Sequence, residues 1–231
     1  LSYKKKVEAS STLEGYPTEN AVNEDIRTWW SAKTADKGEF MTVDLDRNSK
    51  VYAIQVNFAD QDATAFGKSD SIYYQYRIEE SQDGITWNLL VDKSENKADA
   101  PNDYIQLDKP VDARYIRITN IYFPSGKFSI SGLRVFGKAD KPVPATAQFT
   151  ELTRNSDNRR TVNLNWNKVN DATGYNIRFG TQKNKLYHNY LVYEDNKVSI
   201  NVLNADQTYY FAIDSFNEAG ITVGKEIKII Q

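Results

Sequence analysis

The sequence predicts an all-β protein built from two sandwich domains. Short runs in which apolar and polar side chains alternate recur between turn signals along the whole chain, which is the pattern of antiparallel sandwiches. The chain is also rich in aromatic residues, with 15 Tyr, 10 Phe and 4 Trp among 231 residues, and these residues favour strands. No segment shows a sustained 3.6-residue apolar stripe of the kind that a surface helix needs.

In the first half the alternating runs predict a series of strands separated by turns. The expected strands are Phe40–Leu45, Val51–Phe58, Tyr74–Glu79, Trp87–Val91, Ala113–Thr119 and Ile130–Phe136. Alternation places Tyr52, Ile54, Val56 and Phe58 together on one face of their strand. The dipeptide Asp83-Gly84 predicts a tight turn before the strand that follows it.

A composition change near residue 140 predicts the domain boundary. Pro142 and Pro144 lie within three residues of each other beside Gly, Ala and charged residues, which is typical of a short, stiff linker. We therefore expect a first domain at 1–138, a linker at 139–143 and a second domain at 144–231.

Composition excludes several classes of function. Cysteine is absent, so disulfides, zinc–thiolate sites and cysteine nucleophiles are excluded. The net charge of −2 argues against nucleic acid and anionic membrane surfaces as partners, and no apolar run approaches the about 18 residues of a membrane span. The chain starts at Leu1 and contains a single methionine, Met41, so we expect it to be a processed piece of a longer protein.

The sequence predicts a non-catalytic chain. The single histidine, His188, lies in a polar stretch and is expected in a solvated loop. No Gly-x-Ser-x-Gly elbow or glycine-rich phosphate loop is present. Glu79 and Glu80 are neighbours on a predicted strand, so they point to opposite faces and cannot form the facing carboxylate pair of a glycosidase.

The stretch 20–32 predicts an ordered loop with two tryptophans and many oxygen-bearing side chains. The oxygen-bearing residues are Asn20, Asn23, Glu24, Asp25 and Thr28. A hard cation such as calcium would neutralise these oxygens. Hydrogen bonds from Asn and Asp side chains to the backbone would also hold such a loop without a metal. The residues alone leave both interpretations open.

The first half carries five motifs in a fixed order: Thr28-Trp29-Trp30, then segments 42–45, 76–87, 113–119 and 133–137. Together they resemble a discoidin domain, also called coagulation factor 5/8 type C, whose bacterial relatives include the family-32 carbohydrate-binding modules. The resemblance implies an eight-stranded jelly-roll sandwich with ligand loops at one end. It also implies that Trp30 is the buried member of the tryptophan pair.

The resemblance implies a structural calcium ion beside the tryptophan loop. Its ligands would be the Asn20 carbonyl, Asn23, Asp25, Thr28, the Ser131 carbonyl and Gly132. Asn23 stands where an aspartate is common, and Gly132 stands where a glutamate is common. Fewer carboxylates lower the affinity of such a site for calcium.

The second half resembles a fibronectin type III domain. Trp166 ends an alternating run as an inward anchor, and Leu203 precedes Tyr209 by six residues. That is the spacing of a tyrosine corner, in which the phenol bonds to an upstream backbone group. Ala205 stands where a proline is common. We assign these residues to the core.

Two aromatic loops of the first domain are candidate sugar contacts. Segment 60–68 contains Phe66, and segment 121–127 contains Tyr122, Phe123 and Lys127. An aromatic ring can stack on the apolar face of a pyranose while polar groups bond its hydroxyls. Alternatively, the rings dock onto a catalytic domain or onto the second half.

Taken together, these resemblances imply a carbohydrate-binding accessory region of a larger bacterial glycoside hydrolase, with family 43 as the expected parent. The expected partners are a polysaccharide or oligosaccharide and an upstream catalytic domain of the same chain. The expected location is secreted, periplasmic or at the cell surface. A structural scaffold that binds no free ligand is the first alternative. A cell-surface adhesion module is the second, and the missing cysteines and the acidic balance disfavour it.

Overall fold

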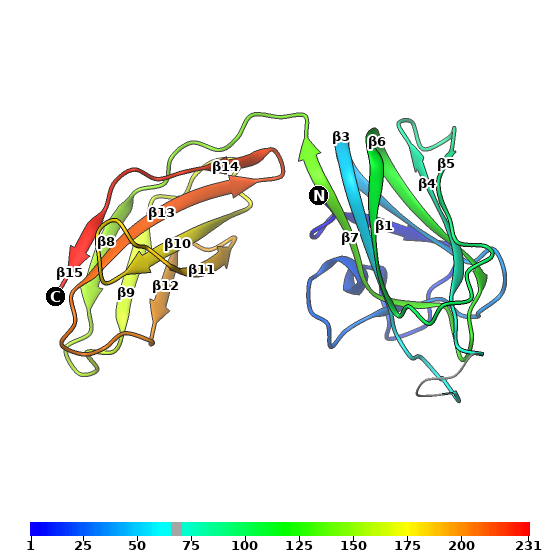
Figure 1. Cartoon of the computed structure of the whole chain (residues 1–231), viewed down its shortest axis with the longest axis horizontal. Coiled ribbons are helices and arrows are strands. Elements are labelled where there is room, and N and C mark those ends of the chain that lie inside the picture. Colours follow the sequence, from blue (N-terminus) through cyan, green and yellow to red (C-terminus); the bar gives the residue numbers. More distant parts are fainter. Residues whose placement is uncertain (66–70) are drawn as a thin grey trace. The chain divides into compact units, whose positions relative to one another are not determined.

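The chain folds into two β-sheet units, Leu1–Asp140 and Lys141–Gln231, as the computed structural model in Figure 1 shows. The structure describes residues 1–65 and 71–231. Within those ranges the one helical segment is a short 3-10 turn, η1, at Thr18–Val22, and no described helix is long and apolar enough to cross a membrane. The all-β prediction is confirmed, and the division between the units falls within the predicted linker.

The described residues of unit 1 form seven strands in one hydrogen-bonded set. The strands are β1 Lys6–Ala9, β2 Trp30–Ser31, β3 Phe40–Phe58, β4 Gln75–Ser81, β5 Asn88–Asp92, β6 Asn102–Tyr122 and β7 Ser129–Ala139. Their order is β2-β7-β3-β6-β4-β5, and β1 pairs with the first part of β3.

Two long strands belong to both layers of this sandwich. The first part of β3 pairs with the last part of β6, and the second part of β3 pairs with the start of β6 and with β7. The two strands predicted over 40–45 and 51–58 are therefore halves of one strand. A register shift between Val51 and Ala53 reverses the alternation there. Tyr52 consequently points outward, 38% exposed, and its predicted place on one face with Ile54, Val56 and Phe58 is wrong.

Trp30 is the central aromatic residue of the unit 1 core. It is fully buried, its ring meets that of Phe128 edge-on at 5.5 Å, and its Nε1–H donates to Thr12 Oγ1 at 3.3 Å. The prediction that Trp30 is the buried member of the pair is confirmed. The predicted inward face of Tyr74, Tyr76 and Ile78 is buried as well.

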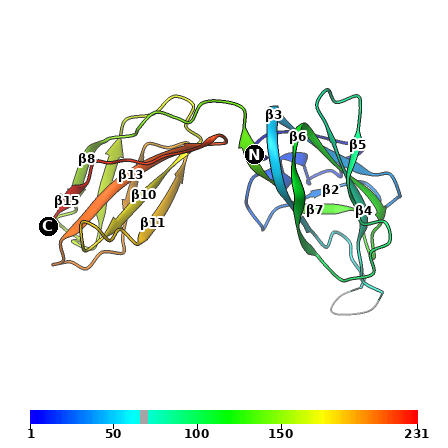
Figure 2. The same cartoon turned by 45° about the horizontal axis from the view of Figure 1, so that its top comes forward.

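Unit 2 is a second, smaller sandwich. One sheet contains β8 Phe149–Arg154, β9 Val162–Trp166 and β12 Lys197–Ile200. The other contains β10 Gly174–Gly180, β11 His188–Tyr193, β13 Tyr209–Asn217, β14 Gly220–Thr222 and β15 Lys228–Ile230. Figure 2 shows β10, β11 and β13 side by side.

Trp166 anchors the core of unit 2, edge-on to Tyr175 at 5.3 Å. The phenol oxygen of Tyr209 accepts a hydrogen bond from the Asn204 N–H at 3.1 Å, which confirms the contact expected from the tyrosine-corner spacing. His188 is exposed but is the first residue of β11 and lies against the Phe179 ring, so its predicted place in a loop is wrong. Pairing of 188–193 with β10 extends the sheet through that polar segment.

Candidate functional site

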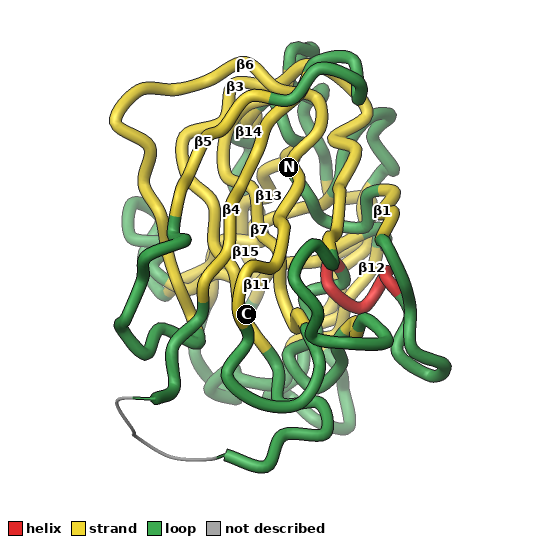
Figure 3. The backbone as a smooth tube through the Cα atoms, turned by 90° about the vertical axis from the view of Figure 1, so that its right-hand side faces the viewer, coloured by secondary structure: helices red, strands yellow, loops and turns green. Residues whose placement is uncertain are grey.

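The loops that carry the predicted sugar contacts gather at one end of unit 1. They connect β3 to β4 and β6 to β7, and the β5–β6 connection lies at the same end. This end is opposite the one at which β7 leads into the linker (Figure 1, lower end). Figure 3 shows the same loops in green below the strands. We call this region the loop end. Phe66, one of the predicted contacts, lies outside the described residues.

Tyr122 presents an exposed aromatic surface at the loop end. It is the last residue of β6 rather than a loop residue, it is 37% exposed, and its ring stacks on that of Tyr73 at 4.8 Å and 29°. Lys97 Nζ lies 4.4 Å from the centre of the Tyr73 ring and 3.2 Å from its phenol oxygen. Sequence reasoning missed Tyr73, although the inward-facing Tyr74 beside it predicts that Tyr73 faces out.

Phe123 belongs to the core. It is 9% exposed, and its ring lies 5.3 Å from that of Tyr74 and 5.8 Å from those of Phe58 and Phe128. Side-chain alternation at the end of β6 turns Tyr122 outward and the next residue inward. The small exposed part of the Phe123 ring lines a hollow at the loop end, so its contact with a sugar stays a prediction.

Lys127 ties the two predicted loops together. Its Nζ lies 3.0 Å from Asp62 Oδ2, and its backbone N–H donates to the Gln61 carbonyl at 2.9 Å. Hydrogen bonds from Lys127 and Gln61 lower the pKa of Asp62. Gly126 allows this approach, because it has φ +77° and an added Cβ would lie 2.1 Å from the Gln61 oxygen. The loop end thus holds an aromatic surface together with charged hydrogen-bonding groups.

Ser125 reinforces the same contact. Its hydroxyl accepts hydrogen bonds from the backbone N–H groups of Thr64 and Ala65 at 2.7 and 3.1 Å. A hollow of about 180 Å³ opens beside this contact, and its polar lining includes Asp60, Asp99 and Ser125.

The structure brings four of the predicted metal ligands into one loop, where they bond to one another. Thr28 Oγ1 donates to the Asp25 carbonyl at 3.0 Å and accepts from Asn23 Nδ2 at 2.9 Å. Asn23 Oδ1 accepts the Asp25 N–H at 2.8 Å, and Asn20 Nδ2 donates to the Trp29 carbonyl. Both oxygens of Asp25 accept from the Arg27 guanidinium at 2.9 Å, and these contacts lower the pKa of Asp25 to about 2.

A second guanidinium lies where β7 meets this loop. Arg134 Nε donates to Glu24 Oε2 at 2.6 Å, and Arg134 Nη1 lies 3.3 Å from the position that a Cβ of Gly132 would occupy. Ser131 directs its hydroxyl to the Asn57 carbonyl. Within the described ranges no three His, Cys, Asp or Glu side chains form a group that could hold a metal. Among the expected ligands Asp25 supplies the one carboxylate, and Arg27 already neutralises it. Arg134 lies beside Gly132, where a glutamate ligand is common. This arrangement does not fit calcium.

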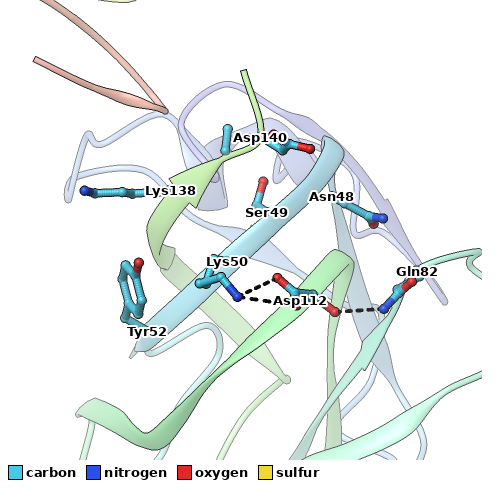
Figure 4. Close-up of a pocket in the computed structure, with 9 residues that line it drawn as sticks. Asn48, Ser49, Lys50, Tyr52, Gln82, Asp112, Lys138 and Asp140 are labelled. Carbon is cyan, nitrogen blue, oxygen red and sulfur yellow. Dashed lines mark hydrogen bonds and ion pairs between the residues drawn. The ribbon is translucent and has the colours of Figure 1, made fainter. Parts of the chain in front are cut away.

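Another hollow of unit 1, of about 600 Å³, lies at the opposite end from these loops. Its charged groups bond across β3 and β6: Lys50 Nζ lies 3.1 Å from Asp112 Oδ1, and Gln82 Nε2 donates to the Asp112 carbonyl at 3.4 Å. Figure 4 shows these contacts and the Lys138 side chain pointing away from them. Lys50, Asp112 and Gln82 bond to one another, and we assign the hollow no function.

The sandwich of unit 1, with its loops at one end, defines the class of discoidin-type domains. The chain belongs to the F5/8 type C domain family, whose model matches residues 6–131. Among curated protein sequences no relative matches the chain.

Solved structures share this fold at low sequence identity. Chitosan-binding module 2 of a chitosanase/glucanase from Paenibacillus sp. IK-5, in complex with chitotriose, is 18% identical with a TM-score of 0.50, over 59% of this chain and 98% of that one. The family 32 module of Clostridium perfringens NanJ, in complex with galactose, is 24% identical with a TM-score of 0.46, over 57% and 93%. At these identities the likeness is one of fold.

Proposed function

We propose that unit 1 is a non-catalytic carbohydrate-binding module that takes a polysaccharide or oligosaccharide at the loop end. The observation that carries this proposal is the exposed Tyr122 ring, stacked on Tyr73, on the same side of the sandwich as the Lys127–Asp62 pair. A sugar ring offers an apolar face to an aromatic side chain and hydroxyls to charged groups, so it matches both features. The chitotriose-bound module that shares this fold is a precedent for the ligand class.

The proposal extends to the context of the chain. The unit would serve a larger bacterial glycoside hydrolase, with family 43 as the expected parent, and an upstream catalytic domain would lie in the same chain. Unit 2 would act as a fibronectin type III-like spacer. The protein would work in a secreted, periplasmic or cell-surface location, where polysaccharides are found.

Affinity gels that contain plant and host polysaccharides test the proposal. We expect at least one polysaccharide to retard the wild-type chain, and Tyr122→Ala to abolish that retardation. Tyr104→Ala is the matched control, because Tyr104 is an exposed tyrosine of the same strand, β6. If no polysaccharide in the gels retards the wild type, the carbohydrate-binding proposal fails.

A second candidate is a scaffold that packs against the catalytic domain without binding free sugar. The pair Tyr104 and Phe136 favours it, because these rings lie 5.9 Å apart on β6 and β7 and are 58% and 40% exposed. Such neighbouring apolar side chains on a surface are typical of protein contacts. Tyr104→Ala and Phe136→Ala would then weaken association with a separately produced catalytic domain and leave the affinity gels unchanged.

A further inference from the structure

A second hollow of unit 1 lies on the outward face of the sheet, away from the loop end. It measures about 310 Å³, within the range of roughly 300–1,000 Å³ that small-molecule sites occupy. We call it the sheet-face groove. It is lined by Lys6 and Glu8 of β1, Phe40, Thr42 and Asp44 of β3, Gly84 and Trp87 of the β4–β5 connection, and Tyr115 and Arg117 of β6.

The strands place these side chains together by alternation. Thr42 pairs with Arg117 and Asp44 with Tyr115 across β3 and β6. Their neighbours Met41, Val43, Ile116 and Ile118 are buried in the core. The groove residues therefore line the other, solvent-facing side of the same sheet.

Arg117 is held firmly but is left with unused donors. Its guanidinium lies 3.7 Å from the centre of the Trp87 ring and 4.8 Å from that of Phe40, and its Nε donates to Thr42 Oγ1 at 3.1 Å. Its terminal nitrogens have no hydrogen-bond or ion-pair partner in the part of the chain that the structure describes. Glu79 lies opposite Arg117 in the register of β4 and β6 but makes no ion pair with it there. A guanidinium fixed by aromatic rings with free terminal N–H groups suits a carboxylate in two-point contact.

The other charged groups of the groove are paired, and the carboxylates of Glu8 and Asp44 can accept further hydrogen bonds. Lys6 Nζ bonds Glu8 at 2.7 Å, and Arg114 bonds both oxygens of Asp44 at 2.9 Å. Although burial opposes it, the hydrogen bonds from Arg114 and from the Asp46 N–H lower the pKa of Asp44. Ionised carboxylates repel a second anion, but they accept hydrogen bonds from hydroxyl groups. The groove thus matches a ligand with one carboxylate and several hydroxyls.

We propose that the sheet-face groove is a second binding site of unit 1, specific for a sugar acid whose carboxylate meets Arg117 and whose hydroxyls meet Glu8 and Asp44. The ligand class rests on the proposed function, whereas the groove shares none of the loop-end residues. Inorganic phosphate fits poorly, because it brings more negative charge and fewer hydroxyl donors than a sugar acid to the two carboxylates.

Calorimetric titration of the full chain with galacturonic acid, which has one carboxylate and several hydroxyls, tests this site. We expect binding that weakens about tenfold or more in Arg117→Gln, the loss typical of a hydrogen bond to a charged group. The methyl ester of galacturonic acid should bind the wild-type protein more weakly by a similar factor, so the test does not depend on a variant alone. Arg77→Gln is the matched control, because Arg77 is an exposed arginine of the adjacent strand β4 that pairs with Asp92. Addition of the acid should also shift the Arg117 Nε–H and Trp87 Nε1–H NMR signals.

Three results would overturn the proposal. The first is no binding of the acid by wild type up to about 10 mM, where a millimolar Kd would be visible. The second is binding that survives Arg117→Gln and is lost in Tyr122→Ala, which would place the acid at the loop end. The third is binding of phosphate as tight as that of galacturonic acid. If the wild-type chain binds the acid at Arg117 but binds no neutral sugar at the loop end, the result contradicts the proposed function alone.

Discussion

At the scale of single residues, Trp30 is the largest fully buried side chain of unit 1. Its side chain is fully buried and packs against Phe128. We expect Trp30→Ala to lower the free energy of unfolding by about 3–5 kcal/mol, the range for emptying a large aromatic site in a core. Trp29→Ala should have a clearly smaller effect, since Trp29 is only partly buried and donates to Gln61 at its edge. Denaturant titration of both variants compares them, and equal effects would contradict this assignment.

Asp83 makes the turn between β4 and β5 sensitive to acid. The backbone N–H groups of Thr86 and Ile85, with the Ser81 hydroxyl, lower the pKa of Asp83 from 3.8 to about 2. Because the folded pKa is lowered, the stabilisation is present above pH 4 and is lost as the pH falls through about 2. We expect wild type to lose stability relative to Asp83→Asn over this interval, measured by denaturant unfolding at successive pH values. A stability difference between the two proteins that stays constant from pH 5 to about 2 would show that Asp83 does not titrate in this way.

At the scale of elements, the tryptophan loop is closed by its own side chains and by two arginines. Arg27 neutralises Asp25, and Arg134 pairs with Glu24 across the gap to β7. We therefore expect EDTA and added calcium to leave the melting temperature of the chain unchanged. Arg134→Met should lower the melting temperature measurably, and Arg77→Met serves as its control. A calcium-dependent rise in melting temperature that Asp25→Ala abolishes would show instead that the loop binds the metal.

The sequence predicted the elements of unit 1 better than their connections. Alternation identified the buried faces of Tyr74, Tyr76 and Ile78, because period-two patterning records which face of a strand is covered. It could not locate the register shift that turns Tyr52 outward, since a bulge is set by pairing with distant strands. The same limit applied to β3 and β6, whose passage through both layers depends on long-range pairing.

The candidate sites also depend on contacts between distant parts of the chain, which local sequence patterns do not reveal. Tyr122 and Lys127 were predicted from their loop, whereas Phe123 was placed outside a core that only the fold defines. The sheet-face groove draws residues from β1, β3, β6 and the β4–β5 connection, which are separated widely along the chain. Its central contact, Arg117 on Trp87, has no local pattern that would indicate it.

At the scale of the whole molecule, the chain contains two independent cores. Every buried apolar residue of the first cluster lies between Ala21 and Val135, and every one of the second lies between Ala147 and Ile230. We expect residues 1–140 and 141–231, produced separately, each to unfold in one cooperative transition, because each has a core of its own. Calorimetry of the two pieces checks this, and a piece that melts without a transition would show that its core depends on the other.

Carbohydrate binding at the loop end is the central claim, and NMR mapping of unit 1 tests it most directly. Soluble oligosaccharides are titrated into isotope-labelled residues 1–140, and backbone amide shifts are followed for wild type, Tyr122→Ala and Tyr104→Ala. We predict that a neutral oligosaccharide shifts amides around Tyr73, Tyr122 and Lys127, and that Tyr122→Ala alone removes these shifts. Shifts centred on Tyr104 and Phe136, or none with any oligosaccharide, would contradict the claim.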